Sequence, residues 1–481
     1  MPNQIHDVVI IGAGISGIGT AYWLQQKCPD KDFTILEARN SIGGTWSLFK
    51  YPGIRSDSDM FTFGYRFRPW VNPQSISSGK NILQYLKDTV KDAGIEEHIR
   101  FGNKMISADW SDQSRTWTLQ VTTPKGEEEV ECKFLSICTG YYNYREAHRP
   151  HFRGEEDFKG KIVLPQFWPK DLDYSGKKIA VVGSGATAVT LVPSLIESGA
   201  DHVTMVQRSP TYIMNLPNRN GLFIALNKIL PSKWAFRFTR WKNISLQMIS
   251  FGLAKLFPKM MKGLLMKAAA KDLPENYPVE KHFNPRYNPW DQRLCVVPDG
   301  DLFKTIKDGK AAVNTGTISH FTENGIEMES GEKIDADLIV LATGLKMQLL
   351  GGADIRVDGV PSYFSDAMIY KGMMVSDLPN FIYAFGYTNA SWTLKVDLTA
   401  NYLCKLLNYM DRKGYYVVIP KRENLESDED FLNLSSGYIQ RAKTILPKQG
   451  KRRPWKVYQN YLVDMLATRF GRIRDSVLKF Q

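Results

Sequence analysis

The sequence predicts an α/β fold with two dinucleotide-binding, Rossmann-like domains, and three observations support this. A glycine-rich turn lies between an apolar strand and a helix in two segments, one at the N-terminus and one starting near residue 178. Two apolar strands, in FLSICTG and DLIVLATG, end in Thr-Gly at Gly140 and Gly344, and each is expected to return the chain towards the other domain. The 481 residues, 43% apolar and 23% charged, suffice for two or three domains with a large core.

The first glycine-rich turn lies in DVVIIGAGISGIGTAYWLQ. Gly12 permits the tight turn, Gly14 lets the backbone approach a pyrophosphate, and Gly17 lets helix and strand pack closely. Ser16 is expected to cap the helix or to reach the pyrophosphate. The next strand ends in Glu37, whose carboxylate accepts hydrogen bonds from ribose hydroxyls and repels a 2′-phosphate. This unit predicts an FAD site.

The second turn lies in KKIAVVGSGATAVTLVPSLIESG, with Gly183, Gly185 and Ala188 in the fingerprint positions. The strand that follows ends in Arg208 and Ser209 without an acidic residue. A guanidinium pairs with a phosphate and a hydroxyl donates to it, which favours NADPH over NADH. One fingerprint with an acid and one with a base at the ribose position together predict the cofactor pair FAD and NADPH.

The expected order along the chain is FAD half, NADPH domain, FAD half. Residues 1–145 are assigned to the first FAD part and 146–175 to a linker that contains FKGKIVLPQFWP. Residues 176–335 are assigned to the NADPH domain, with a basic helical insertion at about 215–280, and 336–481 to the second FAD part and C-terminal tail. From Asp337 onwards the chain is expected to rejoin the first sheet.

The net charge of +12 comes from one segment. From His202 to Lys271 there are twelve Lys and Arg and no Asp or Glu, and the rest of the chain is balanced. Apolar residues recur there at helical spacing, interrupted at Pro231 and Pro258. One interpretation is a helical insertion that caps the NADPH site; the other is a peripheral membrane contact through residues 202–271, because basic amphipathic helices with Trp and Phe bind anionic lipid. Nucleic acid is not expected, since no recognition motif accompanies the charge.

The remaining composition predicts a cytoplasmic protein, peripheral to a membrane if the basic segment binds lipid. No secretory signal and no apolar run of about 18–20 residues is visible. The five cysteines are scattered and form no CxxC or metal-like cluster, so most are expected to be packing residues and no metal site is predicted. The spacing of Cys132 and Cys138 on one apolar strand argues against a disulfide reductase. The oligomeric state is not predicted.

Two further motifs carry a resemblance to a known family. GGTWSLFKYPGIRSD follows Glu37, and FKGKIVLPQFWP falls between the two fingerprints, with Phe158, Gly160, Trp168 and Pro169 in the positions of a family pattern. Together with YNPWDQRLC and GYTNASWTLK, these motifs resemble class B flavoprotein monooxygenases of the Baeyer–Villiger type over nearly the whole chain.

The resemblance implies an enzyme in which NADPH reduces FAD and the flavin adds O2 to give a flavin peroxide. The peroxide anion inserts one oxygen atom into a ketone to give an ester or lactone, and the protonated form oxygenates the sulfur of sulfides or thioamides. The expected substrate is a small apolar ketone or sulfide. An S- or N-oxygenating flavin monooxygenase and a poorly coupled NADPH oxidase stay open as alternatives.

The resemblance also implies roles for single residues. Arg293 matches the active-site arginine that holds the peroxide anion, and Asp57 the carboxylate that pairs with it near the flavin. Many members have Lys where this chain has Gln292, so Arg208 is expected to bear more of the NADPH phosphate recognition. The cofactor-binding residues expected from the fingerprints and the resemblance together are Gly12, Gly14, Ser16, Gly17, Glu37, Thr45, Trp46, Leu48, Arg55, Asp57, Met105, Gly183, Ser184, Gly185, Ala186, Thr187, Ala188, Thr190, Arg208 and Ser209.

Leu164 departs from the family pattern, which has His in its place. In one interpretation Leu164 continues the apolar run of Ile162 and Val163 into the core. In the other it weakens the coupling between NADPH and oxygenation, because leucine cannot donate, accept or titrate. The sequence leaves both open.

Overall fold

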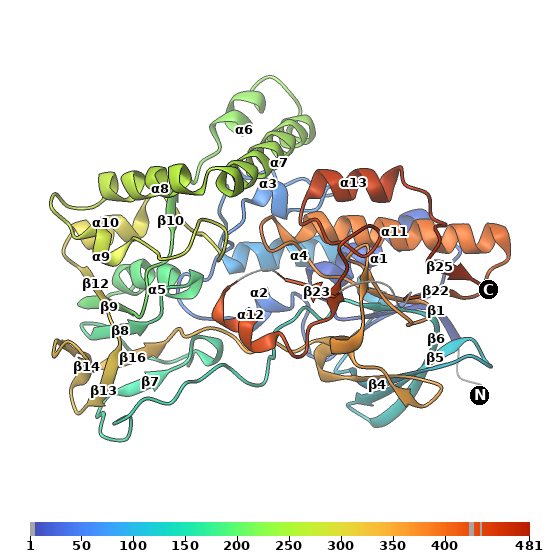
Figure 1. Cartoon of the computed structure of the whole chain (residues 1–481), viewed down its shortest axis with the longest axis horizontal. Coiled ribbons are helices and arrows are strands. Elements are labelled where there is room, and N and C mark those ends of the chain that lie inside the picture. The colour runs from blue at the N-terminus through green and yellow to red at the C-terminus, as the bar shows by residue number, and fades with distance from the viewer. Residues whose placement is uncertain (1–4, 423–427, 433–434) are drawn as a thin grey trace.

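The computed structural model describes residues 5–422, 428–432 and 435–481. Within them the chain forms two α/β units side by side, built on a sheet of nine strands and a sheet of five (Figure 1). The predicted fold class is confirmed.

The first sheet has the order β18-β17-β4-β5-β6-β1-β2-β3, with β21 also paired to β6. β1, β2, β3, β6 and β21 are parallel, and β4, β5 and β6 form an antiparallel meander that widens the sheet. Its strands are β1 (Ile5–Ile11), β2 (Phe33–Glu37), β3 (Ile99–Phe101), β4 (Lys104–Ser111), β5 (Thr116–Thr123), β6 (Gly126–Ile137), β17 (Asp354–Val357), β18 (Val360–Pro361) and β21 (Phe381–Tyr383).

Helices pack on this sheet, chiefly α1, which joins β1 to β2, and the long α11 beside it. Trp23 of α1 donates to the carboxylate of Asp397 on α11, at 2.7 Å. The helices and single turns of this unit are α1 (Ile15–Lys27), α2 (Thr45–Leu48), α3 (Met60–Phe63), α4 (Gly79–Asp92), η1 (Glu96–His98), η3 (Leu350–Gly352), η4 (Phe364–Asp366), α11 (Trp392–Lys413), α12 (Gly437–Ala442) and α13 (Tyr461–Arg469). Short strand pairs complete it: β19 (Ile369–Tyr370) with β20 (Met374–Val375), β22 (Val418–Pro420) with β25 (Leu478–Phe480), and β23 (Glu429–Asp430) with β24 (Lys448–Gln449).

The second sheet is entirely parallel, in the order β12-β9-β8-β16-β7. Its strands are β7 (Lys161–Val163), β8 (Lys178–Val182), β9 (His202–Gln207), β12 (Ala311–Thr315) and β16 (Leu338–Leu341). All four residues of β16 are buried, as expected for a strand covered on both faces of a parallel sheet. The surrounding elements are η2 (Pro165–Phe167), α5 (Ala186–Glu197), β10 (Ile213–Leu216), α9 (Val279–His282), β11 (Cys295–Pro298), α10 (Asp301–Lys307), β13 (Ile318–Thr322), β14 (Gly325–Met328) and β15 (Lys333–Asp335).

The return to the first sheet comes later than expected. The chain was expected to rejoin that sheet from Asp337, but β16 pairs with β8 on one side and β7 on the other, and the first strand back in the nine-stranded sheet is β17. The segment expected as a linker likewise contributes β7 to the edge of the second sheet. An apolar run identifies a buried strand but does not say which sheet the strand joins.

Two connections between the sheets run side by side as an antiparallel pair, which we call the crossover pair (residues 141–148 and 343–348). The Gln348 amide donates to the Tyr141 carbonyl at 3.0 Å, and the Asn143 amide donates to the Lys346 carbonyl at 2.9 Å. The Thr343 hydroxyl donates to the His148 carbonyl at 3.1 Å. Both passages of the chain between the units are therefore tied to each other.

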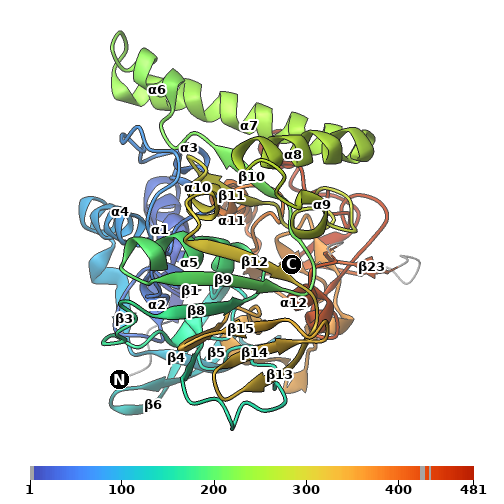
Figure 2. The same ribbon diagram turned by 90° about the vertical axis from the view of Figure 1, so that its left-hand side faces the viewer.

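The basic insertion forms a layer of three helices along one edge of the molecule, α6 (Gly221–Leu226), α7 (Ser232–Leu256) and α8 (Pro258–Asp272), and the long α7 is seen lengthwise in Figure 2. Its breaks lie where the prolines predict them, because α7 begins after Pro231 and α8 begins at Pro258. The layer is fastened to the first unit by the buried Arg240, which donates to the carbonyls of Phe61, Thr62 and Gly64.

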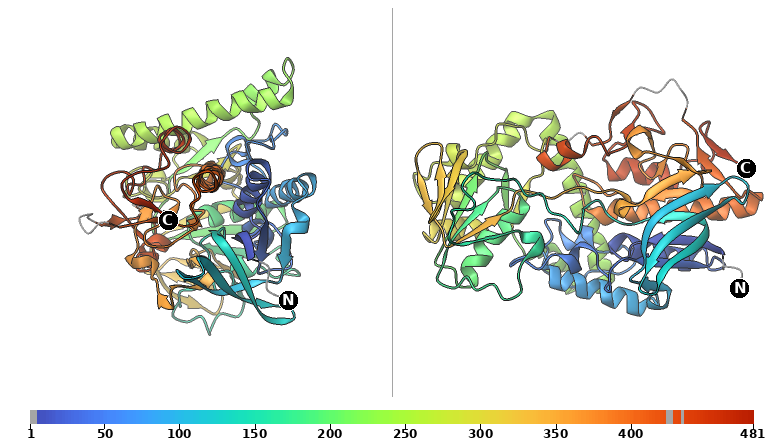
Figure 3. Two further views of the ribbon diagram at one scale, coloured as in Figure 1. Left: turned by 90° about the vertical axis from the view of Figure 1, so that its right-hand side faces the viewer. Right: turned by 90° about the horizontal axis from the view of Figure 1, so that it is seen from below.

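Figure 3 shows the two units from the end and from below, with the crossover pair between them and the C-terminal α13 beside α7. In the described part of the chain, no helix is long and apolar enough to cross a bilayer.

Candidate active site

A pocket of about 1100 Å³ lies at the carboxyl ends of the parallel strands of the first sheet. Gly12, Gly14 and Ser16 line it from the turn after β1, Glu37 from the end of β2, and Met105 from β4. This is the edge of an open α/β sheet at which ligands are generally bound.

The glycines of the first fingerprint have the geometry that the motif requires. Gly12 has φ +103°, and a Cβ there would lie 2.8 Å from the Cys138 carbonyl oxygen. A Cβ on Gly17 would lie 1.9 Å from the Gly12 carbonyl oxygen, so α1 packs on the turn only because that position is glycine. A Cβ on Gly14 would meet nothing closer than Gly44 Cα at 3.7 Å, which leaves its pocket side open to a ligand.

Glu37 is held in place by backbone amides. Its two carboxylate oxygens accept from the amides of Ala13, at 2.8 Å, and Arg39, at 2.9 Å. Burial raises the pKa of the Glu37 carboxyl, and these two hydrogen bonds oppose that rise by favouring the charged form. The carboxylate is thus fixed at the pocket wall, and its oxygens retain lone pairs that can accept hydrogen bonds from ribose hydroxyls.

Ser16 does not cap α1. The N-cap residue is Gly14, without a side-chain cap, and the Ser16 hydroxyl accepts from the indole N–H of Trp392 at 2.9 Å. Ser16 and Trp392 both line the large pocket, so the second expectation, contact with a ligand there, stays a prediction. Ser16 is already the second residue of α1, and its partner Trp392 lies 376 positions away along the chain, so no local pattern could indicate this contact.

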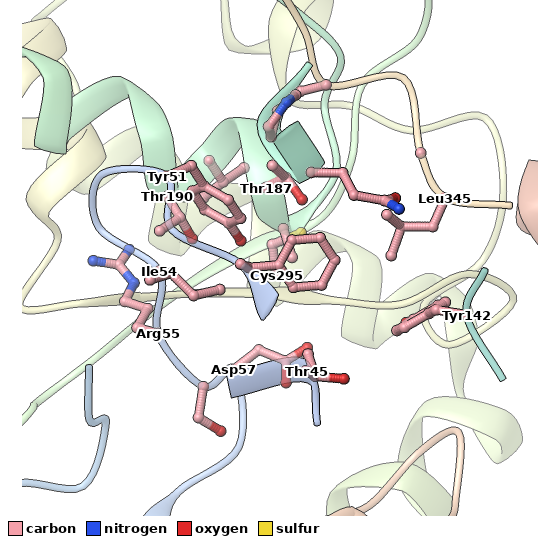
Figure 4. A pocket seen from close by; sticks show the side chains of 18 of the residues that line it. Thr45, Tyr51, Ile54, Arg55, Asp57, Tyr142, Thr187, Thr190, Cys295 and Leu345 are labelled. Carbon is pink, nitrogen blue, oxygen red and sulfur yellow. The ribbon is translucent and has the colours of Figure 1, made fainter. Parts of the chain in front are cut away.

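A second pocket, of about 160 Å³, lies beside the first and between the two units (Figure 4). Thr45, Trp46, Asp57, Tyr142 and Arg293 belong to the walls of both pockets, whereas Leu48 lines only the large one. The residues lining both pockets therefore mark the place where a ligand of the first sheet and a ligand of the second would meet.

Arg293 and Asp57 form an ion pair at this junction, with 3.4 Å between Nη1 and Oδ2. The Asp57 carboxylate raises the pKa of the Arg293 guanidinium, and nearby tyrosines, Tyr141 first among them, act in the same direction. About a third of each side chain is still accessible, 38% for Arg293 and 30% for Asp57. The Arg293 guanidinium, a permanent cation paired with the Asp57 carboxylate, therefore lines both pockets.

The YPGIRSD motif fastens the first unit to the second. Tyr51 is buried in the core of the second unit, in one cluster with Val189 and Leu191 of α5. Gly53 has φ +75°, and a Cβ there would lie 1.9 Å from Ser194 Oγ on the same helix. The Arg55 guanidinium forms an ion pair with Asp301 of α10. Arg55 was expected among the cofactor-binding residues; it lines the small pocket, but its charge is already paired within the protein.

The second fingerprint contributes only part of its predicted residues to these pockets. Thr187 and Thr190 line the small pocket together with Ala186, as Figure 4 shows for the two threonines. The fingerprint and ribose-position residues that line neither pocket are Gly183, Ser184, Gly185, Ala188, Arg208 and Ser209.

The local geometry around five of these residues is compatible with a dinucleotide site, and their role in binding NADPH stays a prediction. Gly183 has φ +141°, and its Cβ would lie 2.3 Å from the Ala342 carbonyl oxygen, while a Cβ on Gly185 would meet nothing within 4 Å. The Ser184 hydroxyl donates to the Ser209 carbonyl at 3.1 Å, which brings the two ends of the site together. Arg208 follows β9 directly and is exposed, so its guanidinium is accessible to a phosphate.

Leu164 lies at the wall of the small pocket, at the end of β7, and packs against the core of the second unit. Two residues on, Gln166 is buried and donates to the Asn143 carbonyl of the crossover pair at 2.8 Å. The Gln166 carbonyl oxygen has no hydrogen-bond partner among the described residues. The segment FKGKIVLPQFWP (residues 158–169), which we call the connector, therefore contacts both the small pocket and the crossover pair.

Sequence reasoning gave no role to several residues that form these walls. Tyr141, Tyr142 and Tyr144 line the large pocket directly after the first Thr-Gly, and Trp392 closes it from α11. Trp392 belongs to the motif GYTNASWTLK, whereas the three tyrosines lie in the run GYYNY at residues 140–144. Cys295 lines the small pocket, and the five cysteines are all buried and free.

Comparison with known proteins identifies the family. The model of the flavin-binding monooxygenase-like family matches residues 5–351. The chain belongs to the flavin-binding monooxygenase-like family. It is 52% identical to the FAD-containing monooxygenase EthA of Mycobacterium tuberculosis over 475 residues, which are 98% of this chain and 97% of that protein. The chain is therefore a flavoprotein monooxygenase, as predicted.

Solved structures share the fold of this family member. A steroid monooxygenase bound to NADP superposes with a TM-score of 0.78 at 20% identity, over 99% of both chains. OTEMO in complex with FAD and NADP superposes with a TM-score of 0.74 at 21% identity, again over 99% of both chains. The predicted cofactor pair agrees with the ligands of these neighbours.

Proposed function

We propose that this monooxygenase uses NADPH and O2 to insert one oxygen atom into a small apolar ketone, giving an ester or lactone, and that it also oxygenates the sulfur of sulfides or thioamides. The observation that carries the proposal is the Arg293–Asp57 pair at the junction of the two pockets. A fixed cation at that place suits a reaction in which negative charge develops beside the flavin.

The large pocket fits FAD. Its volume is about 1100 Å³, and its walls combine the glycine turn and the amide-anchored Glu37 with aromatic side chains. The backbone at Gly14 would approach the pyrophosphate of FAD, and the Glu37 carboxylate would accept hydrogen bonds from its ribose hydroxyls. Thr45, Trp46 and Leu48 also line the pocket and would contact the flavin. Met105 on β4 would contact the adenine side. When bound, FAD supplies the redox and oxygen-activating chemistry.

The second unit fits NADPH. The open backbone at Gly185 can face a pyrophosphate, and the exposed Arg208 beside Ser209 can pair with a 2′-phosphate. Gln292 carries no charge to assist, which leaves Arg208 as the principal phosphate contact of this proposal. The nicotinamide end would then point to the small pocket between Thr187 and Arg293.

In this proposal Arg293 would stabilise negative charge that develops on oxygen at the junction of the two pockets. A guanidinium is protonated at every physiological pH, and the Asp57 carboxylate raises the pKa of Arg293 further. Asp57 orients the guanidinium towards the pocket junction. Removing one such donor typically lowers a rate by about 100- to 1000-fold.

A panel of ketones and sulfides tests the proposal. Purified enzyme with NADPH and ¹⁸O2 should convert at least one ketone into an ester that carries a single labelled oxygen atom. Sulfoxide without ester from every ketone of the panel would instead assign an S-oxygenating monooxygenase. Hydrogen peroxide without any oxygenated product would assign a poorly coupled oxidase, the alternative that Leu164 at the small-pocket wall favours.

A further inference from the structure

The α6–α8 layer, residues 221–272, has an unusually apolar outer surface. It holds eleven of the twenty-four exposed large apolar side chains of the described chain. Phe238 is 54% exposed, Ile249 58% and Leu256 72%. The eleven are Ile229, Trp234, Phe238, Trp241, Leu246, Ile249, Leu253, Leu256, Phe257, Met260 and Leu264. Scattered exposed apolar residues are ordinary, but a contiguous cluster of this size marks an interaction surface.

The apolar side chains follow one face of α7. From Trp234 to Leu256 they recur every three to five residues, which places them along the outward side of the helix. The opposite side is buried on the protein, where Phe236 packs near Phe61 with ring centroids 6.2 Å apart. The face is therefore not a stretch of poorly packed core, because the helix already buries a separate face of its own.

Positive charge accompanies the apolar face. The layer contains ten Lys and Arg and a single acid, Asp272, which accepts a hydrogen bond from Asn215 at 2.7 Å. Among the described residues, Lys255 makes the layer's one ion pair, with Asp291 at 2.9 Å. Arg240 is buried and donates to the Phe61 carbonyl of α3, and the other cations of the layer have no ion-pair partner within the part of the chain that the structure describes. The occupant of the face must therefore be both apolar and anionic.

We propose that the α6–α8 layer docks flat on an anionic phospholipid bilayer, with α7 in the interfacial plane. Trp234 and Trp241 would lie at the headgroup level and the aliphatic side chains below them, while lysines contact lipid phosphates. A second copy of the chain fits poorly, because two strongly cationic surfaces would repel each other. Nucleic acid fits poorly as well, because it offers phosphate but no apolar surface of comparable extent.

The location of the layer agrees with a peripheral attachment. The layer forms one edge of the molecule, as Figures 1 and 2 show, and none of its residues lines either pocket. The two pockets do not test the expectation that the insertion caps the NADPH site, because Arg208 and Ser209 line neither of them, and that expectation stays a prediction. The ring centroids of Trp241 and of Tyr461, the first residue of α13, lie 6.4 Å apart. Leu466 of α13 and Phe470 directly after it are also exposed apolar residues.

Vesicle co-sedimentation of the full-length, FAD-loaded enzyme tests the proposal. We expect binding to vesicles of phosphatidylglycerol and phosphatidylcholine at low salt, release as salt rises, and little binding to phosphatidylcholine alone. The triple variant Lys233→Gln, Lys242→Gln, Lys259→Gln should bind about 100-fold more weakly, since each cation near the surface contributes roughly a factor of five. The matched control Lys125→Gln, Lys161→Gln, Lys333→Gln, on strands or turns away from the layer, should bind like the wild type.

A second variant tests the apolar half of the surface. Trp234→Ser with Trp241→Ser should weaken binding even to pure phosphatidylglycerol and abolish part of the blue shift of tryptophan fluorescence that vesicles induce. FAD content and NADPH oxidation with a water-soluble ketone should not change, which shows that the variant is folded. Equal binding by wild type and both layer variants overturns the proposal. So does a dimer that the tryptophan substitutions dissociate, or retention by duplex DNA that outcompetes the anionic vesicles.

Discussion

Arg293 is the residue on which the proposed reaction depends most. Its permanently charged guanidinium is paired with Asp57 and lines both pockets. We expect Arg293→Ala to retain FAD and to be reduced by NADPH but to lose about 100- to 1000-fold in ester formation, because the donor acts only once negative charge forms. Flavin absorbance, anaerobic reduction and product chromatography measure the three steps separately.

The exposed Arg286, seven residues upstream of Arg293, supplies the control for this prediction. Arg286→Ala removes the same charge from a neighbouring position and should leave all three steps at wild-type rates. Ester formed by Arg293→Ala at a similar rate would show that the guanidinium has no part in the reaction.

Leu164 tests whether the connector needs a polar group. It lies at the wall of the small pocket, two residues before Gln166, which donates a hydrogen bond to the Asn143 carbonyl of the crossover pair. Leu164→His would place a donor and acceptor there, and we expect a higher ratio of oxygenated product to NADPH consumed and less hydrogen peroxide, with unchanged FAD content. Both quantities are measured on one ketone with wild type and variant side by side.

Leu164→Met separates polarity from shape, because methionine fills similar volume without a strong hydrogen-bonding group. Leu164→Met should leave the ratio of oxygenated product to NADPH consumed at the wild-type value. If Leu164→His leaves the ratio unmoved as well, the leucine is ordinary packing and the connector works without an imidazole.

At the scale of elements, the YPGIRSD loop acts as a clamp on α5. Gly53 occupies the left-handed region at φ +75°, with Ser194 Oγ 1.9 Å from the place of a Cβ. Gly53→Ala adds both a backbone penalty of about 1–2 kcal/mol and a clash with α5, and it should lower the thermal midpoint and weaken the contact between the units. Differential scanning calorimetry measures the midpoint, and limited proteolysis the contact.

Gly176 offers a matched comparison, since it has φ +65° with nothing within 4 Å of the place of a Cβ. Gly176→Ala should carry only the backbone penalty. Equal midpoints for the two variants would mean that α5 adjusts to the added methyl group and that the loop is not a clamp.

The second βαβ element carries the proposed choice of cofactor. Arg208 follows β9 and is exposed, and no acid stands at the ribose position. We expect Arg208→Ala to raise the KM for NADPH by about tenfold or more, since a charge-assisted pair contributes about 1.5–3 kcal/mol, and to change the KM for NADH little. Steady-state kinetics with both nucleotides measure this, and equal effects would remove Arg208 from the phosphate site.

For the whole molecule, buried thiols and phenols predict sensitivity to alkali. Burial raises the pKa of Cys138 to about 11, of Cys295 to about 12 and of Tyr51 to about 12. These groups bind their protons more tightly when folded than when unfolded, where thiols titrate near ~8.5 and phenols near ~10. Their contribution to stability is complete below the unfolded pKa values and is lost as pH rises towards the folded ones.

We therefore expect the free energy of unfolding to be steady near pH 8 and to fall between pH ~9 and ~12, by up to about 1.4 kcal/mol per pH unit for each such group. Urea unfolding at a series of pH values measures it. Cys138→Ala removes one titrating thiol and should make the decline shallower. A midpoint independent of pH over this range would contradict the prediction.

The sequence by itself determined the parts of this protein that obey local rules. The two glycine turns, the breaks at Pro231 and Pro258, and Glu37 and Arg208 at the ribose positions follow from spacing and backbone sterics within a few residues. The fold class was predicted on the same ground, whereas the monooxygenase family was predicted from the resemblance of several motifs to those of known members. The roles of the two turns, Glu37 and Arg208 in holding cofactors stay predictions.

Only the tertiary structure decided which distant groups meet. It put β16 in the second sheet, gave Ser16 the indole of Trp392 and Arg55 the carboxylate of Asp301, and gathered tyrosines around Arg293. It also chose which face of α7 is left exposed. Periodicity within a segment records that a face is apolar, but whether that face meets the core or the surroundings depends on contacts between residues hundreds of positions apart, which no local pattern encodes.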